Sequence, residues 1–262
     1  MDADSDVKVG VCHEYGSHRD RDDILFAQPE GSCFGDCPIC FLPFPIESLK
    51  HKSSCCCKTI CVGCACADIK HHMNRSLERT CPFCREPLPA TSAKIVANLM
   101  RRVEANDPVA MQQVGHVHYF KGEYAKAIQY RSKAARLGDA LAHYDLSLMY
   151  LKGKGVEKDE QKFFHHAEEA AIAGHPRARY NLGAIEWKDG NFERAVKHFI
   201  IAANLGEGES LKMLKEGYAK GLVSKEDFAA ALRAHQAAVD ATKSEQREAA
   251  DAELKKVKYK WS

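Results

Sequence analysis

Apolar residues recur at helical spacing through the second half of the chain, from about residue 94 to the end. Ala, Leu, Tyr, Lys and Glu dominate this region, which holds two prolines and regularly placed glycines. Three stretches end in Ala-Ala-x-x-Gly, and their closing glycines Gly138, Gly174 and Gly206 are 36 and 32 residues apart. A period in this range predicts helix–turn–helix units stacked into a solenoid.

Each repeating unit is expected to contain two helices separated by a break. Gly122 and Gly190 provide the break in the first and third units, and a longer loop around Gly153 provides it in the second. A degraded fourth unit follows, and then an Ala-rich, charged stretch with few apolar positions. We therefore expect helical repeats over residues 94–222 and a charged capping helix and tail over residues 223–262.

The first half of the chain is marked instead by cysteine. Eleven of the twelve cysteines lie from Cys33 to Cys84. Six of them form three pairs with the spacing Cys-x-x-Cys. Two thiolates separated by two residues reach one Zn²⁺ from a tight turn, and eight ligands complete two tetrahedral sites. Residues 33–90 are thus predicted to be a module that binds two zinc ions. The candidate ligands are Cys37, Cys40, Cys55, Cys56, Cys57, Cys61, Cys64, Cys81 and Cys84.

Composition narrows the classes of partner and compartment. The net charge of +2 gives no general argument for nucleic acid or an anionic membrane as partner. No apolar run reaches transmembrane length, and the Asp-rich start lacks the features of a signal peptide. We expect a cytoplasmic or nuclear protein, in which the thiols stay reduced. Residues 1–32 are acid-heavy and are predicted to form a disordered tail.

The cysteine module resembles a RING finger, the zinc-binding module of many ubiquitin ligases. The resemblance runs from Cys37-Pro-Ile-Cys40 to Cys81-Pro-Phe-Cys84-Arg85. The helical half resembles Sel-one-like repeats, relatives of tetratricopeptide repeats, through the pattern Ala…Leu-Gly…Tyr…Gly…Ala-Ala-x-x-Gly over residues 107–206. Together these resemblances imply a small α+β zinc module with cross-braced ligands, followed by an all-α helical-repeat solenoid.

The RING resemblance also implies how the ligands divide, because in that family pairs one and three hold one ion and pairs two and four the other. Which two of the three central cysteines bind metal is left open. Cys55 and Cys57 have the usual cysteine-x-histidine spacing. Cys56 is followed by four residues before Cys61, a spacing found in all-cysteine relatives. His51 is an alternative ligand, and Cys12, Cys33 and Cys66 are bystanders. The implied first site is Cys37, Cys40, Cys61 and Cys64, and the second is Cys81, Cys84 and two of Cys55, Cys56 and Cys57.

The resemblance implies catalysis by positioning, since RING fingers hold a ubiquitin-conjugating enzyme charged with ubiquitin in a reactive posture. It assigns the contact with that enzyme to Ile39, Pro82 and Arg85, with Ile69 on the following helix, where the family often supplies a tryptophan. Each has a structural alternative. Ile39 can pack under its own loop, Pro82 can shape a turn, and Arg85 can be a solvated charge.

The hypothesis from sequence is therefore a RING-type ubiquitin-protein ligase whose repeats capture a substrate or adaptor. Gln112, His116, His143 and Arg179 are candidate residues of the concave surface that binds it. The alternative is a non-catalytic, zinc-dependent scaffold for protein interactions. A zinc module that binds nucleic acid is disfavoured, because the region lacks a basic recognition helix with interleaved aromatic residues.

Overall fold

The computed structural model describes residues 18–46, 50–75 and 78–258. The regular elements among these residues are helices, apart from one two-stranded antiparallel sheet in which His51 pairs with Ile60. The elements, in chain order, are α1 (His18–Leu25), β1 (Lys50–Lys52), β2 (Thr59–Cys61), α2 (Val62–Asn74), α3 (Ser92–Glu104), α4 (Pro108–Phe120), α5 (Tyr124–Arg136), α6 (Ala140–Lys152), α7 (Glu160–Ile172), α8 (Pro176–Lys188), α9 (Phe192–Asn204), α10 (Gly208–Ala219), α11 (Lys225–Ala241) and α12 (Glu245–Lys258).

Helices α4 to α9 form the predicted solenoid. They pack as the pairs α4–α5, α6–α7 and α8–α9, and each pair contacts the next. The closing glycines Gly138, Gly174 and Gly206 have φ of +83°, +82° and +91°, a left-handed conformation that glycine adopts without strain. The side chains of Asp107 and Asp139 cap the first helix of their units by accepting backbone N–H bonds. The prediction of a helical-repeat solenoid is confirmed.

Small residues allow the paired helices to approach each other closely. Ala134, Ala170 and Ala202, one from each unit, are completely buried. A Cβ placed on Gly183 in α8 would lie 2.8 Å from the ring of Phe199 in α9, so this position has no room for a larger residue. The alanines and glycines that mark the repeat in the sequence are therefore the contact points between its helices.

Residues 18–32, predicted to belong to a disordered tail, are instead structured. Helix α1 packs on α7, and its last residue, Leu25, is buried in the repeat core with Phe163 and Leu182. The acidic character that suggested disorder is offset locally, because Asp22 forms an ion pair of 2.7 Å with Arg194. Residues 1–17 of the expected tail, Cys12 among them, lie outside the described part of the chain.

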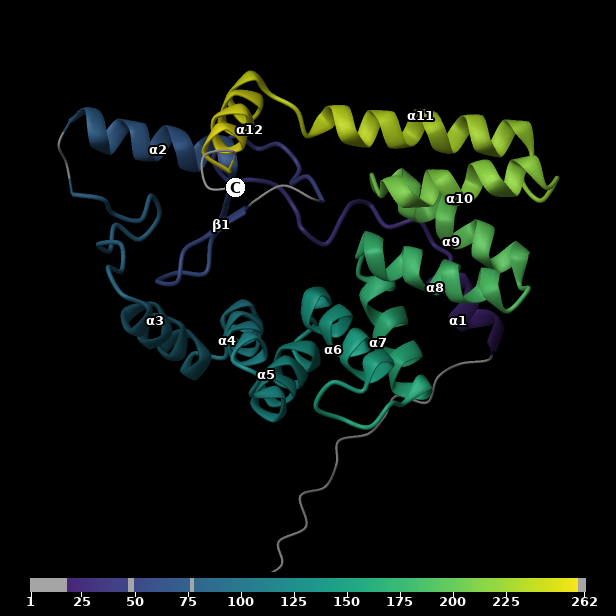
Figure 1. The fold of residues 1–262 in the computed structure, drawn as a ribbon, viewed down its shortest axis with the longest axis horizontal. Coiled ribbons are helices and arrows are strands. Elements are labelled where there is room, and N and C mark those ends of the chain that lie inside the picture. Colours follow the sequence, from purple (N-terminus) through teal and green to yellow (C-terminus); the bar gives the residue numbers. More distant parts are fainter. Residues whose placement is uncertain (1–17, 47–49, 76–77, 259–262) are drawn as a thin grey trace, which may run out of the picture.

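The C-terminal helices pack on the last repeat and on the cysteine module. Helix α11 covers the last repeat, with Phe228 and Ala231 packed against the core of α9 and α10. The region after it is not a simple tail, since α12 turns back and packs along α2 of the cysteine module. Figure 1 shows the resulting ring, with α12 (yellow) beside α2 (blue). No helix among the described residues is long and apolar enough to cross a bilayer.

Candidate metal centre

Three loops of the cysteine module share one backbone geometry. In each loop the fifth residue donates its N–H to the carbonyl of the first and has φ of +57° or +58°. The N–H of the first residue in turn bonds to the carbonyl of the sixth, at 2.8 to 3.0 Å. These loops are residues 37–42, 53–58 and 81–86. Their first positions hold Cys37, Ser53 and Cys81, and their fourth positions hold Cys40, Cys56 and Cys84.

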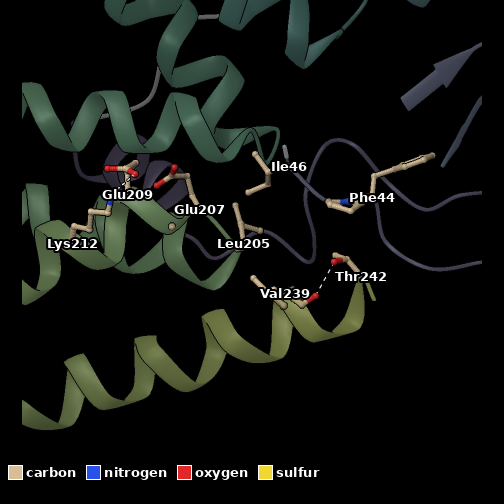
Figure 2. Close-up of a pocket in the computed structure, with 12 residues that line it drawn as sticks. Phe44, Ile46, Leu205, Glu207, Glu209, Lys212, Val239 and Thr242 are labelled. Carbon is tan, nitrogen blue, oxygen red and sulfur yellow. Dashed lines mark hydrogen bonds and ion pairs between the residues drawn. The ribbon is translucent and has the colours of Figure 1, made fainter. Parts of the chain in front are cut away.

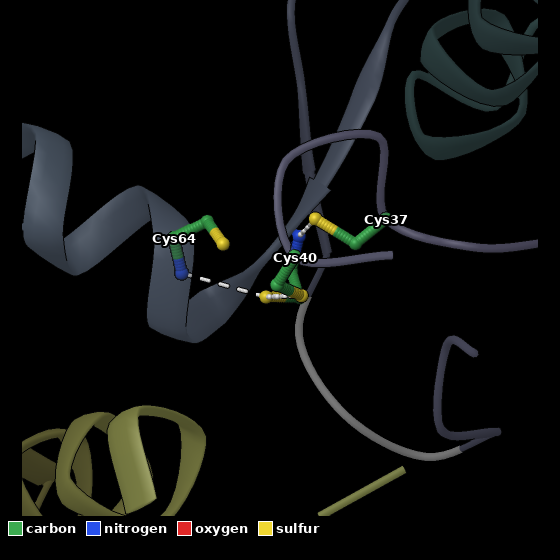
Figure 3. Close-up of side chains that lie close together, drawn as sticks. Cys37, Cys40 and Cys64 are labelled. Atoms are coloured by element: carbon green, nitrogen blue, oxygen red, sulfur yellow. Dashed lines mark hydrogen bonds between the residues drawn. The ribbon is translucent and has the colours of Figure 1, made fainter. Parts of the chain in front are cut away.

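The first cluster of thiols joins the loop 37–42 to the start of α2. The sulfur atoms of Cys37, Cys40, Cys61 and Cys64 all lie within 4.8 Å of one another, and those of Cys40 and Cys61 are 3.8 Å apart. Cys61 is also the N-cap of α2, where its sulfur accepts the N–H of Cys64 at 3.4 Å. Figure 3 shows Cys37, Cys40 and Cys64 converging at this helix end.

The second cluster joins the loops 53–58 and 81–86. It consists of Cys55, Cys56, Cys81 and Cys84, again with all sulfur atoms within 4.8 Å of one another. The Cys56–Cys81 sulfur distance is 3.6 Å and the Cys55–Cys84 distance is 3.3 Å. Along the chain the two clusters interleave, because pairs one and three form the first and pairs two and four form the second.

Both clusters have the dimensions that a tetrahedral metal ion requires. Four sulfur atoms at about 2.3 Å from a central Zn²⁺ are about 3.8 Å from each other. The three contacts given above, of 3.3 to 3.8 Å, lie close to this value, and the other sulfur–sulfur separations are at most 4.8 Å, whereas a disulfide needs about 2.05 Å. All the described cysteines are free thiols. The arrangement is therefore one that can hold two metal ions.

The electrostatics of the thiols point the same way. Burial raises the pKa of Cys37, but the N–H groups of Cys40 and Cys61 outweigh it and lower that pKa to about 6. Burial and the neighbouring thiols raise the pKa of Cys64 and of Cys55. A cluster of four thiolates thus repels itself until a cation neutralises it, which is the task of a bound divalent metal.

The loop geometry explains which central cysteines join a cluster. Cys56 stands at the fourth position of its loop, equivalent to Cys40 and Cys84, and Cys55 supplies the ligand that Ser53 cannot. Cys57 occupies the fifth position and is turned away into an apolar core with Leu99. The expectation from spacing alone left this choice open. The residues 53–58 can be recognised as a third loop of the same kind only if a serine is allowed at its first position. A search for Cys-x-x-Cys pairs does not find this loop.

The other cysteines and His51 lie outside both clusters in the described part of the chain. His51 is exposed on β1, and Cys66 lies on α2 near Glu253 of α12. Cys33 is largely enclosed beside Lys50, and this burial raises its pKa to about 12. A thiol with so high a pKa stays protonated at neutral pH, as expected of a structural cysteine.

The residues assigned to a conjugating enzyme lie mostly at the surface of this module. Ile39 is 42% exposed within the first loop, and Pro82 and Arg85 are exposed within the third. Ile69 is half-buried on α2. Phe41, which is not among the residues predicted from the sequence, is 77% exposed and occupies the same loop position as Arg85. The sequence could have indicated this residue, because Phe41 directly follows Cys40 just as Arg85 directly follows Cys84.

The candidate residues of the repeat surface are less accessible than expected. Arg179 is fully buried, and Gln112 is buried and donates a hydrogen bond to Asp145 at 3.1 Å. His143 is half-buried, with one ring nitrogen 3.0 Å from the carbonyl of Ala135. These three side chains serve helix packing, because the polar positions of a stacked helix satisfy its neighbours as well as its ligands.

His116 alone of the four is exposed, and it lines two adjoining hollows between the first repeat and its neighbours. One, of about 390 Å³, lies among α3, α4 and α6 and is bordered by Lys52 of β1. The other, of about 180 Å³, extends along α4 and α6. A third hollow, of about 350 Å³, lies where the cysteine module meets the last repeat, with Ile46, Leu205 and Val239 around it (Figure 2).

Comparison with known proteins identifies the repeats. The Sel1 repeat family model matches residues 3–25, 108–139, 140–175 and 176–207. The last three ranges coincide with the pairs α4–α5, α6–α7 and α8–α9. Residues 26–107, which hold both cysteine clusters, lie outside the matched ranges.

The similar proteins share only part of their length with this chain. Chitin synthase regulatory factor 4 of Schizosaccharomyces pombe is 28% identical over 134 residues, which are 48% of this chain and 21% of that protein. The ERAD-associated E3 ubiquitin-protein ligase component HRD3B of Arabidopsis thaliana is 37% identical over 103 residues, 37% of this chain and 16% of that protein.

Among solved structures, the crystal structure of a Sel1 repeat protein from Oxalobacter formigenes is similar over 68% of this chain and 73% of that one, with 20% identity and a TM-score of 0.49. The family matches fall on the helix pairs that the sequence period predicts. Residues 108–207 of this chain are therefore three consecutive Sel1 repeats.

Proposed function

We propose that this protein is a RING-type ubiquitin-protein ligase, with a zinc-bound module that positions a charged conjugating enzyme and repeats that hold a substrate or adaptor. The observation that carries the proposal is the interleaving of two four-thiol clusters around equivalent loops, with Ile39 and Arg85 exposed on two of those loops. Interleaved ligands tie distant parts of a short chain together, and so they fix the relative positions of the two loops.

Zinc is the metal that this donor set favours. Clusters of four cysteine thiolates in a tetrahedral arrangement are typical of structural zinc and of iron–sulfur centres. The first cluster is held by Cys37, Cys40, Cys61 and Cys64, and the second by Cys55, Cys56, Cys81 and Cys84. The bound metal supplies the folding energy of the module, which has only two short strands and one helix of its own. A reducing compartment, cytoplasmic or nuclear, suits these free thiols.

In this function the module contributes positioning and no covalent chemistry. Ile39 and Phe41 offer apolar surface to the conjugating enzyme, and burial of that surface drives the association. Arg85 has five donors in a planar fork, which suits directed hydrogen bonds to the enzyme and to ubiquitin together. Holding the donor in one reactive geometry accelerates transfer because less orientational entropy is lost at the transition state.

The repeats support the second half of the proposal. A solenoid offers an extended surface for another protein, and the hollow bordered by His116 and Lys52 is its open part next to the cysteine module. A partner bound there lies between the repeats and the module that would position the ubiquitin donor. The similarity to HRD3B, whose name describes a component of a ubiquitin ligase, agrees with a role in ubiquitin-dependent protein interaction.

The test is an autoubiquitination assay with a panel of conjugating enzymes. We expect transfer by the wild type, and at least a tenfold loss in Ile39→Ala and in Arg85→Ala with two metal ions still bound in each. Leu232→Ala is the matched control, since Leu232 on α11 is an apolar residue of similar exposure, 48% against 42% for Ile39, and is remote from the module in sequence. Absence of transfer with every enzyme of the panel would rule out the ligase.

The second candidate is a zinc-dependent scaffold without ligase activity. It is favoured by the half-buried Ile69 on α2, which offers a conjugating enzyme less apolar surface than a tryptophan. A pull-down of conjugating enzymes on the immobilised protein separates the two functions. Binding that Ile39→Ala abolishes supports the ligase, whereas no retention of any conjugating enzyme supports the scaffold.

A further inference from the structure

Arg247 of α12 reaches into the cysteine module from the far end of the chain. Its side chain is only 4% exposed and its guanidinium donates four hydrogen bonds. Two go to the carbonyls of Pro43 and Leu42, at 2.7 and 3.0 Å, and one goes to the carbonyl of Thr242 at 2.7 Å. The fourth goes to the sulfur of Cys40, a member of the first thiol cluster, at 3.3 Å.

The backbones on the two sides of this contact are fitted closely. A Cβ placed on Gly63, in the first turn of α2, would lie 3.0 Å from the backbone nitrogen of Arg247. Further along the same pair of helices, Lys70 and Glu253 form an exposed ion pair of 2.8 Å. The face of α2 that carries Gly63, Cys66 and Lys70 is therefore the face that α12 covers.

A buried guanidinium has two effects on a thiolate cluster. Four thiolates around one divalent cation leave a net charge of about −2, and a cation next to one sulfur offsets part of it. The N–H groups also fix the direction of that sulfur and of its loop, as outer groups around metal ligands commonly do. Among the described residues, no arginine or lysine donates to a sulfur of the second cluster.

We propose that Arg247 is a positioning residue for the first metal site and that it couples occupancy of this site to the docking of α12. The fork of the guanidinium bonds the loop carbonyls and the ligand sulfur together, so the loop keeps its ligand geometry only while α12 is in place. By reciprocity, a metal in the first cluster holds α12 on α2 and keeps the ring closed. The proposal rests on the metal occupancy proposed above and is independent of ubiquitin transfer.

The experiment measures metal release from each site of the full-length protein with a chromogenic chelator. Single-site variants Cys40→Ser and Cys56→Ser assign the two release phases to the first and second clusters. We expect Arg247→Gln to release the first ion 10- to 100-fold faster and the second at the wild-type rate. Arg247→Lys keeps the charge without the fork and should fall between the two. Arg233→Gln, an exposed arginine on α11, is the matched control.

Hydrogen exchange provides the reciprocal measurement. Loss of the first metal in Cys40→Ser should increase exchange in α12, whereas loss of the second in Cys56→Ser should not, with α11 as internal reference. Equal acceleration of both ions in Arg247→Gln would indicate general destabilisation and overturn the proposal, as would unchanged release of both. A wild-type chain that binds no metal would instead overturn the proposed function.

Discussion

The guanidinium of Arg179 donates a hydrogen bond to the backbone carbonyl of Leu25, a residue 154 positions earlier in the chain. A second N–H of the same group bonds to the carbonyl of Ala171 at 2.9 Å, and Arg179 has no exposed surface. The surface of the third repeat is thus covered by the chain's own segment around α1. Arg179 is therefore closed to a protein partner, whereas His116 borders an open hollow.

Arg179→Ala should lower the free energy of unfolding by about 2–4 kcal/mol, because it leaves the buried carbonyl of Leu25 without its donor, removes a bond to the carbonyl of Ala171 and opens a cavity. Urea unfolding followed by circular dichroism measures the change. Arg136→Ala, at an exposed position near the end of α5, is the control and should change stability by less than about 0.5 kcal/mol. Equal effects of the two substitutions would contradict the role assigned to Arg179.

The segment around Gly31 passes close to Gly174 at the end of the second repeat, and alanine substitutions at two glycines test this contact. Gly174 and Gly122 both have positive φ, at +82° and +77°, so alanine strains both backbones alike. A Cβ on Gly174 would also lie 2.6 Å from the carbonyl oxygen of Gly31, whereas one on Gly122 meets no atom within 4 Å among the described residues. We expect Gly174→Ala to be at least about 1 kcal/mol more destabilising than Gly122→Ala in thermal unfolding.

Metal stoichiometry distinguishes the three adjacent cysteines. Cys57→Ser should keep two ions per chain, because the Cys57 side chain packs against Leu99 and belongs to neither cluster. Cys55→Ser and Cys56→Ser should each keep one tightly bound ion, since each breaks the second cluster alone. Native mass spectrometry counts the ions. Retention of two ions in Cys56→Ser together with loss of one in Cys57→Ser would reverse the assignment.

Two buried histidines predict a loss of stability in mild acid. Burial lowers the pKa of His175 and of His198 to about 3, against an ordinary value of 6.5. Between pH 6.5 and pH 3 the unfolded chain therefore binds more protons than the native one, so stability falls as the pH falls through this window. Each histidine should contribute a loss of about 2 kcal/mol between pH 7 and pH 5.

Denaturant unfolding at pH 7 and pH 5 measures this loss, and His198→Gln isolates the share of one residue. The variant should lose about 2 kcal/mol less than the wild type over the same interval. His51→Gln, at an exposed position on β1, is the control and should follow the wild type. A His198→Gln variant with the wild-type dependence on pH would show that His198 stays accessible to protons in the native state.

The repeats were predicted well because their signal is local and periodic. Glycines such as Gly138 and Gly174 mark a backbone conformation that other residues rarely adopt, and buried alanines such as Ala170 mark helix contacts. The residues expected on the concave surface of the repeats were predicted poorly. Whether a polar side chain such as Arg179 faces a partner or its own chain depends on segments more than a hundred residues away.

The structured segment at residues 18–32 was missed for a related reason. Its apolar positions are few and its charge is high, so the segment has little tendency to form structure alone. Its order comes from contacts with the repeats, where Leu25 finds an apolar core and Asp22 finds Arg194. Contacts with the repeats, more than a hundred residues away in the sequence, therefore supply the stability of this segment.

The sequence by itself determined the phase of the three central repeats and the supply of thiols for two clusters, because helical periodicity and cysteine spacing are properties of neighbouring residues. Only the tertiary structure decided that Cys56 and not Cys57 joins the second cluster, since that depends on the left-handed φ at the fifth loop position. It also decided that α12 returns to α2 and brings Arg247 to Cys40. Long-range contacts of this kind follow from how the elements pack, and no short stretch of sequence encodes them.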